Sequence, residues 1–177
     1  MKKFFSGLLS LVMIIVGCYM IYNGAIKPHL ENRTALEQSS NISIGDEVAD
    51  KDGVVFCVAN VDNLNSLGEG YSVAQTDNNF VVVTINITNN SGQPYDVNPL
   101  NFTLVEGDKE YEHTNDALFS LENVMFLDTI NPSLSNEYII VYETATTTEQ
   151  SEYRLKIKHN YFSKNDNTYI TLKEVTQ

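Results

Sequence analysis

Short runs in which apolar and polar residues alternate follow one another from Ile44 to the end of the chain. In the run Phe80–Ile87, positions 81, 83, 85 and 87 are all Val or Ile, and Tyr153–Lys158 alternates apolar with basic residues. A period of two residues predicts strands that bury one face. Similar runs lie at 54–59, 102–105, 138–142 and 169–175, and the run at 54–59 is apolar on both faces, which predicts an interior strand.

These runs predict an all-β domain, an immunoglobulin-like β-sandwich of six to seven strands over residues 44–177. Only 116–127 is expected to hold a helical turn. The chain has 177 residues, enough for one domain and an anchor. Its formal charge of −12, from 23 acidic and 11 basic residues, argues against nucleic-acid binding, because such a surface repels phosphates.

An uncharged apolar segment at the N-terminus predicts where the domain is located. Lys2 and Lys3 precede 23 residues, Phe4 to Ile26, that carry no charge. As a helix these would span about 34 Å, enough to cross a hydrocarbon core of about 30 Å. Lysines before the segment favour a cytoplasmic N-terminus. We therefore expect residues 1–27 to be a membrane anchor or lipoprotein signal, 28–43 a polar stalk, and the domain to be extracytoplasmic at the cell membrane.

The same segment allows a second interpretation, in which Cys18 is lipidated. Ile15-Val16-Gly17-Cys18 resembles the lipobox of bacterial lipoprotein signal peptides, with Lys2-Lys3 as the charged region. Tyr19–Tyr22 stays apolar, however, where lipoproteins normally become polar. An uncleaved helix, lipidation at Cys18 and full release all remain open, and all three place the domain outside the cytoplasm. Cys57, the second cysteine, lies in a predicted strand, so a disulfide with Cys18 is not expected.

Several segments together resemble a known bacterial family. They are Ile44–Val48 followed by Asp52-Gly53, the strand Asn79–Ser91 with its final Asn-Asn-Ser, the hairpin Phe102–Tyr111, and Asn131-Pro132 before Tyr138–Tyr142. The family comprises extracytoplasmic immunoglobulin-like domains of unknown function. Its members are often labelled telomeric-repeat-binding-factor-like, and it is akin to the mycobacterial immunoprotective extracellular antigen. Ser133 stands where the family often has the glycine of a Pro-Gly turn. The resemblance covers about residues 42–160 and implies the fold but no catalytic residues.

Two groups of carboxylates are candidate sites. Asp46, Glu47, Asp50 and Asp52 surround a predicted turn, but their spacing does not match a calcium-binding EF-hand loop, and a solvated turn is expected. Glu106, Asp108, Glu110 and Glu112 alternate along an extended segment. Charges on a hairpin edge discourage strand pairing between molecules, and acid–base catalysis would need a concave pocket. We therefore expect no metal, no cofactor and no enzymatic activity.

Three histidines and three basic residues complete the candidates. His29, His113 and His159 lie far apart in the sequence and are expected to be isolated surface residues. Arg154, Lys156 and Lys158 form a basic stripe on one face of a predicted strand. This stripe is a candidate docking patch for an acidic protein or an anionic cell-wall polymer. The alternative is pairing with acidic residues on neighbouring strands.

The sequence thus predicts a membrane-anchored binding or interaction module without chemistry of its own, whose ligand is a protein or a cell-wall component. The first alternative is an accessory or structural subunit whose apolar helix assembles with another membrane protein. Retained function after exchange of residues 4–26 for an unrelated anchor would eliminate that alternative. The second, minor alternative is a hydrolase with an unrecognised site, which would require a deep polar pocket.

Overall fold

The computed structural model describes residues 16, 19–23, 27, 42–69, 73–145, 152–159 and 166–173. Two compact units divide the chain at Gln38 and Ser39. In the first unit, Val16, Tyr19–Ile21 and Lys27 have α-helical backbone. The rest of the expected anchor, Cys18 included, and nearly all of the expected stalk lie outside the described residues. Among those that are described, no helix is both long and apolar enough to cross a bilayer.

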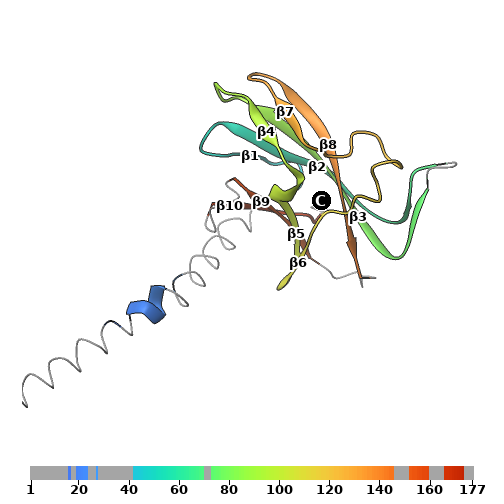
Figure 1. Cartoon of the computed structure of the whole chain (residues 1–177), viewed down its shortest axis with the longest axis horizontal. Helices are drawn as coiled ribbons and strands as arrows, with labels where there is room; N and C mark the ends of the chain where they lie inside the picture. Colours follow the sequence, from blue (N-terminus) through green and yellow to red (C-terminus); the bar gives the residue numbers. More distant parts are fainter. Residues whose placement is uncertain are drawn as a thin grey trace, which may run out of the picture. The chain divides into compact units, whose positions relative to one another are not determined.

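The second unit contains two antiparallel four-stranded sheets and a two-stranded ribbon (Figure 1). The first sheet has the order β1-β2-β3-β8, from Glu47–Ala49, Val54–Leu67, Ala74–Asn89 and Ser135–Thr144. The second has the order β10-β9-β5-β6, from Asn167–Thr171, Tyr153–Lys158, Phe102–Glu106 and Lys109–Tyr111. The ribbon pairs β4, Tyr95–Val97, with β7, Asp128–Ile130, and a 3-10 turn η2, Pro99–Asn101, follows β4.

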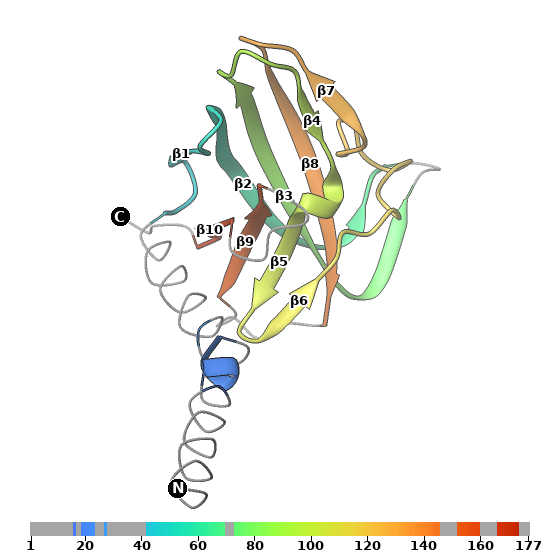
Figure 2. The ribbon, with the colours of Figure 1, turned by 60° about the vertical axis from the view of Figure 1, so that its left-hand side comes forward.

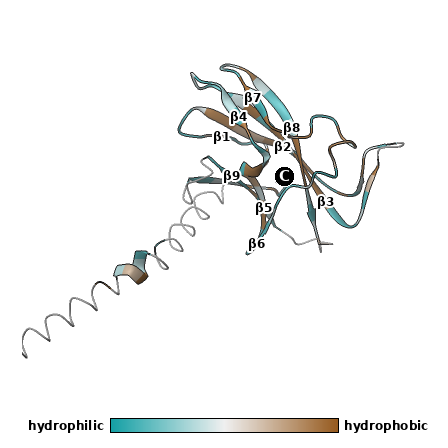
Figure 3. Cartoon of the chain, viewed as in Figure 1, coloured by the Kyte–Doolittle hydropathy of each residue, from teal (hydrophilic) through white to brown (hydrophobic). Residues whose placement is uncertain are grey.

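The two sheets share one core, which makes the unit a sandwich (Figure 2). Val81, Val83, Ile85 and Ile87 are all fully buried, as the alternation in β3 predicted. Apolar residues run along β2 and β3 in Figure 3. Side chains from the second sheet complete the same cluster, among them Phe102, Leu104, Leu155 and Ile157. The predicted all-β class is therefore confirmed.

Phe56 of β2 lies at the centre of this core and is fully buried. Its ring makes edge contacts with Tyr95 of the ribbon, at 6.0 Å between centroids, and with Phe102 of the second sheet, at 6.3 Å. Edge-to-face pairs at such distances add to the energy of burial. One side chain thus connects both sheets and the ribbon.

The segment before β7 covers the outer edge of β8. Thr114 N donates to Val141 O at 2.8 Å, and Met125 N donates to Ile139 O at 2.7 Å. Phe80 and Val82, on the face of β3 opposite the main core, pack in a second apolar cluster with Leu67, Ala117 and Val141. Within 116–127 one hydrogen bond has helical spacing, Leu121 N to Ala117 O at 3.1 Å, and the segment then continues to a bridge with β8.

The strand at 54–59 lies between β1 and β3, as the prediction of an interior strand requires, but only one of its faces is buried. Val54, Phe56 and Val58 are buried, whereas Val55 and Cys57 are half-buried and Ala59 is exposed. The second sheet packs against only one face of β2, so the apolar residues of the other face remain partly in water. Burial, with smaller contributions from Glu47 and Asp46, raises the pKa of the half-buried Cys57 thiol.

Asn89, at the end of β3, connects three segments of chain. Its buried amide nitrogen donates to the carbonyl oxygens of Gln93 and Ile130, both at 2.8 Å. Its amide oxygen accepts hydrogen bonds from the Ser91 backbone at 2.9 Å and the Ser91 hydroxyl at 2.6 Å. Ser133 N also donates to Asn89 O at 2.7 Å. Ser133 has a φ of 66°, a conformation that favours glycine, so serine here adopts the backbone expected of the family's glycine.

Candidate functional site

The basic stripe of β9 is partly paired with its neighbours. Lys156 Nζ lies 2.7 Å from Glu110 Oε1, and the lysine side chain is only 14% exposed. The Arg154 guanidinium lies 5.9 Å from the centroid of the Tyr169 ring, within the range of a cation–π contact. Glu110 lies on β6, which is separated from β9 by β5, so Lys156 pairs with an acidic residue of the same sheet but not of a neighbouring strand. A docking role for Arg154, Lys156 and Lys158 stays a prediction.

The first carboxylate group organises turns. Asp50 Oδ1 accepts hydrogen bonds from the backbone of Asp52 at 2.9 Å and Val54 at 2.8 Å, which closes the turn before β2. Asp46 Oδ2 accepts one from Ser43 N at 2.8 Å. Within the described part of the chain, no three His, Cys, Asp or Glu side chains gather in a way that could hold a metal ion. The carboxylate of Asp50 closes the turn, but its side chain is only 6% exposed, so the turn is not solvated at this residue as expected.

The second carboxylate group lies on the β5–β6 hairpin. Glu106 accepts a hydrogen bond from the Tyr111 hydroxyl at 2.8 Å and pairs with Lys109 at 3.4 Å. Burial and this hydrogen bond raise the pKa of Tyr111 to about 12. Glu110 pairs with Lys156 across the molecule's second sheet. Two of the four hairpin carboxylates, Glu106 and Glu110, are therefore held by partners in the same sheet.

His159 is not the isolated surface residue that the sequence predicted. Its side chain is 7% exposed and Nε2 lies 2.7 Å from Thr168 Oγ1. Nδ1 lies 3.8 Å from Asp50 Oδ2, and the ring contacts that of Phe56 at 5.7 Å between centroids. The prediction was wrong because Asp50 precedes His159 by more than a hundred positions, so its proximity arises only from the fold.

The arrangement Asp50, His159, Thr168 has the order of an orienting acid, a base and a nucleophile. The distance from His159 Nδ1 to Asp50 Oδ2 is longer than a hydrogen bond. The other carboxylate oxygen of Asp50, Oδ1, closes the turn before β2. Beside it, Lys51 Nζ lies 2.8 Å from Asp166 Oδ2, and this hydrogen bond lowers the pKa of Asp166. The cluster is best interpreted as a tie between the β1–β2 turn and the β9–β10 connection.

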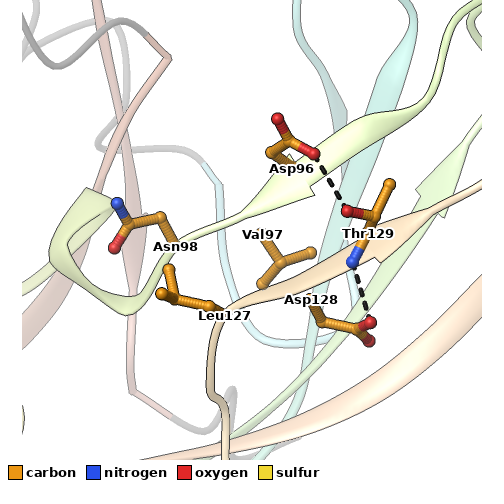
Figure 4. Close-up of a pocket in the computed structure, with 6 residues that line it drawn as sticks. All are labelled: Asp96, Val97, Asn98, Leu127, Asp128 and Thr129. Carbon is orange, nitrogen blue, oxygen red and sulfur yellow. Dashed lines mark hydrogen bonds between the residues drawn. The ribbon is translucent and has the colours of Figure 1, made fainter.

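A shallow pocket lies where the β4–β7 ribbon meets η2, and it has a volume of about 390 Å³ (Figure 4). Six residues line it: Asp96, Val97, Asn98, Leu127, Asp128 and Thr129. Thr129 Oγ1 donates to Asp96 Oδ1 across the ribbon at 3.0 Å. Asn98 Oδ1 accepts from Leu100 N at 3.0 Å and so begins the 3-10 turn. None of these residues is predictable as a site residue from the sequence, because each strand of the ribbon has only three residues and shows no period.

Asp128 is held in its charged form by neighbours. The Tyr138 hydroxyl donates to Asp128 Oδ2 at 2.6 Å, and Thr129 N donates to Oδ1 at 2.7 Å. These hydrogen bonds, that of Tyr138 first, lower the pKa of Asp128. Burial and the same hydrogen bond raise the pKa of Tyr138 to about 12. The pocket therefore keeps this negative charge at neutral pH.

We expect Tyr138→Phe to raise the pKa of Asp128 toward its ordinary value, because the strongest donor to the carboxylate is lost. A carboxylate with a lowered folded pKa stabilises the fold above its unfolded pKa, and this stabilisation is lost as the pH falls through the folded value. Acid unfolding of the variant should thus begin at higher pH. The carboxyl carbon of Asp128, followed by NMR between pH 2 and pH 6, measures the pKa.

Tyr111→Phe is the matched control, since Tyr111 donates to Glu106 on the β5–β6 hairpin. In that variant the titration of Asp128 should stay as in the wild type. An unchanged Asp128 titration in Tyr138→Phe would contradict the assignment of the hydrogen bond.

A family model described as a domain of unknown function (DUF4352) matches residues 42–168. The chain belongs to the DUF4352 family. This match confirms a family of unknown function over the region where the sequence resemblance was found. None of the curated proteins matches this DUF4352 protein by sequence.

Solved structures resemble this DUF4352 protein in fold. The yjhA protein of Bacillus subtilis matches with a TM-score of 0.58 and 17% identity, over 75% of this chain and 99% of its own. The Bacillus subtilis protein ycdA, described as a candidate lipoprotein, matches with a TM-score of 0.56 and 20% identity over 74% of this chain, which spans only 39% of ycdA. MPT63, a secreted protein of Mycobacterium tuberculosis, matches with a TM-score of 0.52 and 13% identity, over 74% of this chain and 94% of its own. At these identities the likeness shows the fold alone.

Proposed function

We propose that this DUF4352 protein is a non-catalytic binding module with an immunoglobulin-like sandwich, held at the extracytoplasmic face of a bacterial membrane by its N-terminal segment. The observation that carries the proposal is the joining of a DUF4352 domain to an uncharged segment led by Lys2 and Lys3. The proteins of similar fold support it, since one is described as a candidate lipoprotein and another as secreted.

The contacts in the domain favour binding over chemistry. The Asp50, His159 and Thr168 cluster ties loops together, and Glu106 and Glu110 of the hairpin have partners in the same sheet. The pocket of the β4–β7 ribbon instead offers a shallow surface with carboxylates, an amide and exposed apolar atoms. Such a mixture fixes the orientation of a bound group through a few polar contacts.

The location is tested on the full chain carrying a C-terminal tag in bacterial cells. Protease applied to intact cells should remove the tag, and the membrane-extracted protein should have a mass that begins at Met1, for a spanning helix, or at Cys18 plus lipid. A tag that survives on intact cells and is lost only after lysis would overturn the proposed location.

Binding is tested by cross-linking the full chain in intact membranes and recovering it through the tag. We expect a specific protein or wall polymer with the full chain and none with a control that ends after residue 41, which keeps the anchor and lacks the domain. Equal recovery with both would assign the interaction to the anchor and would favour the accessory-subunit alternative.

A further inference from the structure

The charges of the domain are distributed very unevenly along its chain. Between Lys51 and Arg154 the only basic residue is Lys109, whereas residues 52–153 contain 16 Asp and Glu residues. This stretch includes β2 to β8, and therefore the whole β4–β7 ribbon and its pocket. A partner that approaches this part of the domain meets a negative potential, which attracts cations and repels acidic proteins and anionic lipid.

Exposed apolar side chains line the pocket or lie within two residues of its lining in the sequence. Leu127, which lines it, is 66% exposed, and its neighbour Phe126 is 60% exposed. Leu100, in the 3-10 turn that begins after Asn98, is 48% exposed. Large apolar side chains that gather beside polar groups on a surface mark sites of interaction. These three residues are here called the apolar rim.

The register of the ribbon places one carboxylate on the same face as Leu127 of this rim. Asp96 pairs with Thr129 directly across the ribbon, and Asn98 and Leu127 lie one step beyond the Val97 and Asp128 pair. Because side chains alternate between faces along a strand, Asp96, Thr129, Asn98 and Leu127 share a face, whereas Val97 points into the core. Figure 4 shows the Asp96 and Thr129 side chains meeting across the two strands.

We propose that this face docks an extended segment of a partner protein in which a Lys or Arg is flanked by apolar side chains. The cation pairs with Asp96, and an apolar neighbour of that cation covers the apolar rim at Leu127. This inference rests on the proposed function as a binding module and names the partner's chemistry. A wholly apolar segment fits less well, because it would strip water from Asp96 without supplying a partner.

Thr129 serves as a positioning residue for this cation. Its hydroxyl donates to Asp96 Oδ1 at 3.0 Å, which orients the carboxylate toward the ribbon face. On the other side of the ribbon, Asp128 keeps its charge through Tyr138 and adds to the negative potential. The site therefore combines one oriented carboxylate, a second nearby charge and an apolar surface.

The test uses the full chain in nanodiscs of neutral lipid, captured for surface plasmon resonance, with empty nanodiscs as background. The probe is the peptide acetyl-Gly-Leu-Lys-Leu-Gly-amide. One matched peptide carries Glu in place of Lys, and another carries Ser in place of both Leu residues. We expect the Lys-Leu peptide to bind and each matched peptide to bind at least about fivefold more weakly, as expected for losing one ion pair or two partly buried side chains.

Two variants locate the binding. Asp96→Asn keeps an acceptor for Thr129 and removes the charge, and Leu127→Ser changes a side chain that is 66% exposed, so neither should disturb the fold. Each variant should lower the affinity for the Lys-Leu peptide about fivefold. Leu64→Ser, which changes an exposed leucine of β2 outside the pocket, should leave the affinity as in the wild type.

Three results would overturn the inference: equal binding of the Glu peptide, unchanged affinity in Asp96→Asn, or no binding of the Lys-Leu peptide. If the cross-linking experiment still recovers a domain-dependent partner, the proposed binding module stands and only this site is wrong. Sedimentation of the full chain in nanodiscs tests whether a second copy of the chain occupies the site. Self-association that Leu127→Ser abolishes would replace the cationic partner by another copy of this chain.

Discussion

Asn89→Ala is expected to lower the free energy of unfolding by about 3 kcal/mol, because truncation removes the buried donor to the Ile130 carbonyl and the hydrogen bonds that hold Gln93 and Ser91. The Asn89 amide nitrogen donates to two carbonyl oxygens, those of Gln93 and Ile130, and the amide oxygen holds Ser91. Each unsatisfied buried group costs about 1 to 3 kcal/mol. The loss is large against the 5 to 15 kcal/mol that stabilises a typical domain.

Urea unfolding followed by tyrosine fluorescence measures this change, since the chain has 10 Tyr and no Trp. Asn90→Ala is the matched control, because Asn90 is the next residue and is exposed. Its midpoint should stay close to that of the wild type. If both variants unfolded at the same urea concentration, the Asn89 side chain would not connect the three segments as described.

Phe56→Ala should destabilise the domain by about 3 to 5 kcal/mol, through the lost burial and the cavity left behind. Phe56 is fully buried and contacts rings from the ribbon, the second sheet and the His159 cluster. The same urea experiment measures the effect. Val55→Ala, a half-buried neighbour on the opposite face of β2, should cost about 1 kcal/mol or less.

A loss below about 1.5 kcal/mol in Phe56→Ala would mean that the surrounding side chains collapse into the cavity. In that case the two sheets and the ribbon would be less rigidly joined than the ring contacts indicate. The ribbon carries the candidate site, so its NMR signals in this variant show whether the core positions that site.

The long strands of the domain were readable from the sequence because their periods extend over many residues. In β3 the alternation from Val81 to Ile87 separates the core face from the other face, and the structure buries all four of those side chains. The alternation in Tyr153–Lys158 likewise matches β9, where Tyr153, Leu155 and Ile157 are buried. A local pattern was enough in both cases.

The candidate site could not be read in the same way. β4 and β7 have three residues each, too few to show a period, and they lie more than 30 positions apart in the sequence. The pairing of Asp96 with Thr129 depends on the whole sandwich. His159 was misjudged for the same physical reason, since Asp50 and Thr168 reach it only after the strands have paired.

The cover over β8 has a consequence for how this domain can engage other chains. The backbone of 113–125 already occupies the outer side of β8 around Ile139 and Val141, so that sheet margin does not offer a template for an incoming strand. Recognition there would have to proceed through side chains. Shortening 115–123 would expose the backbone edge of an apolar strand. The domain should then polymerise through β-pairing between molecules.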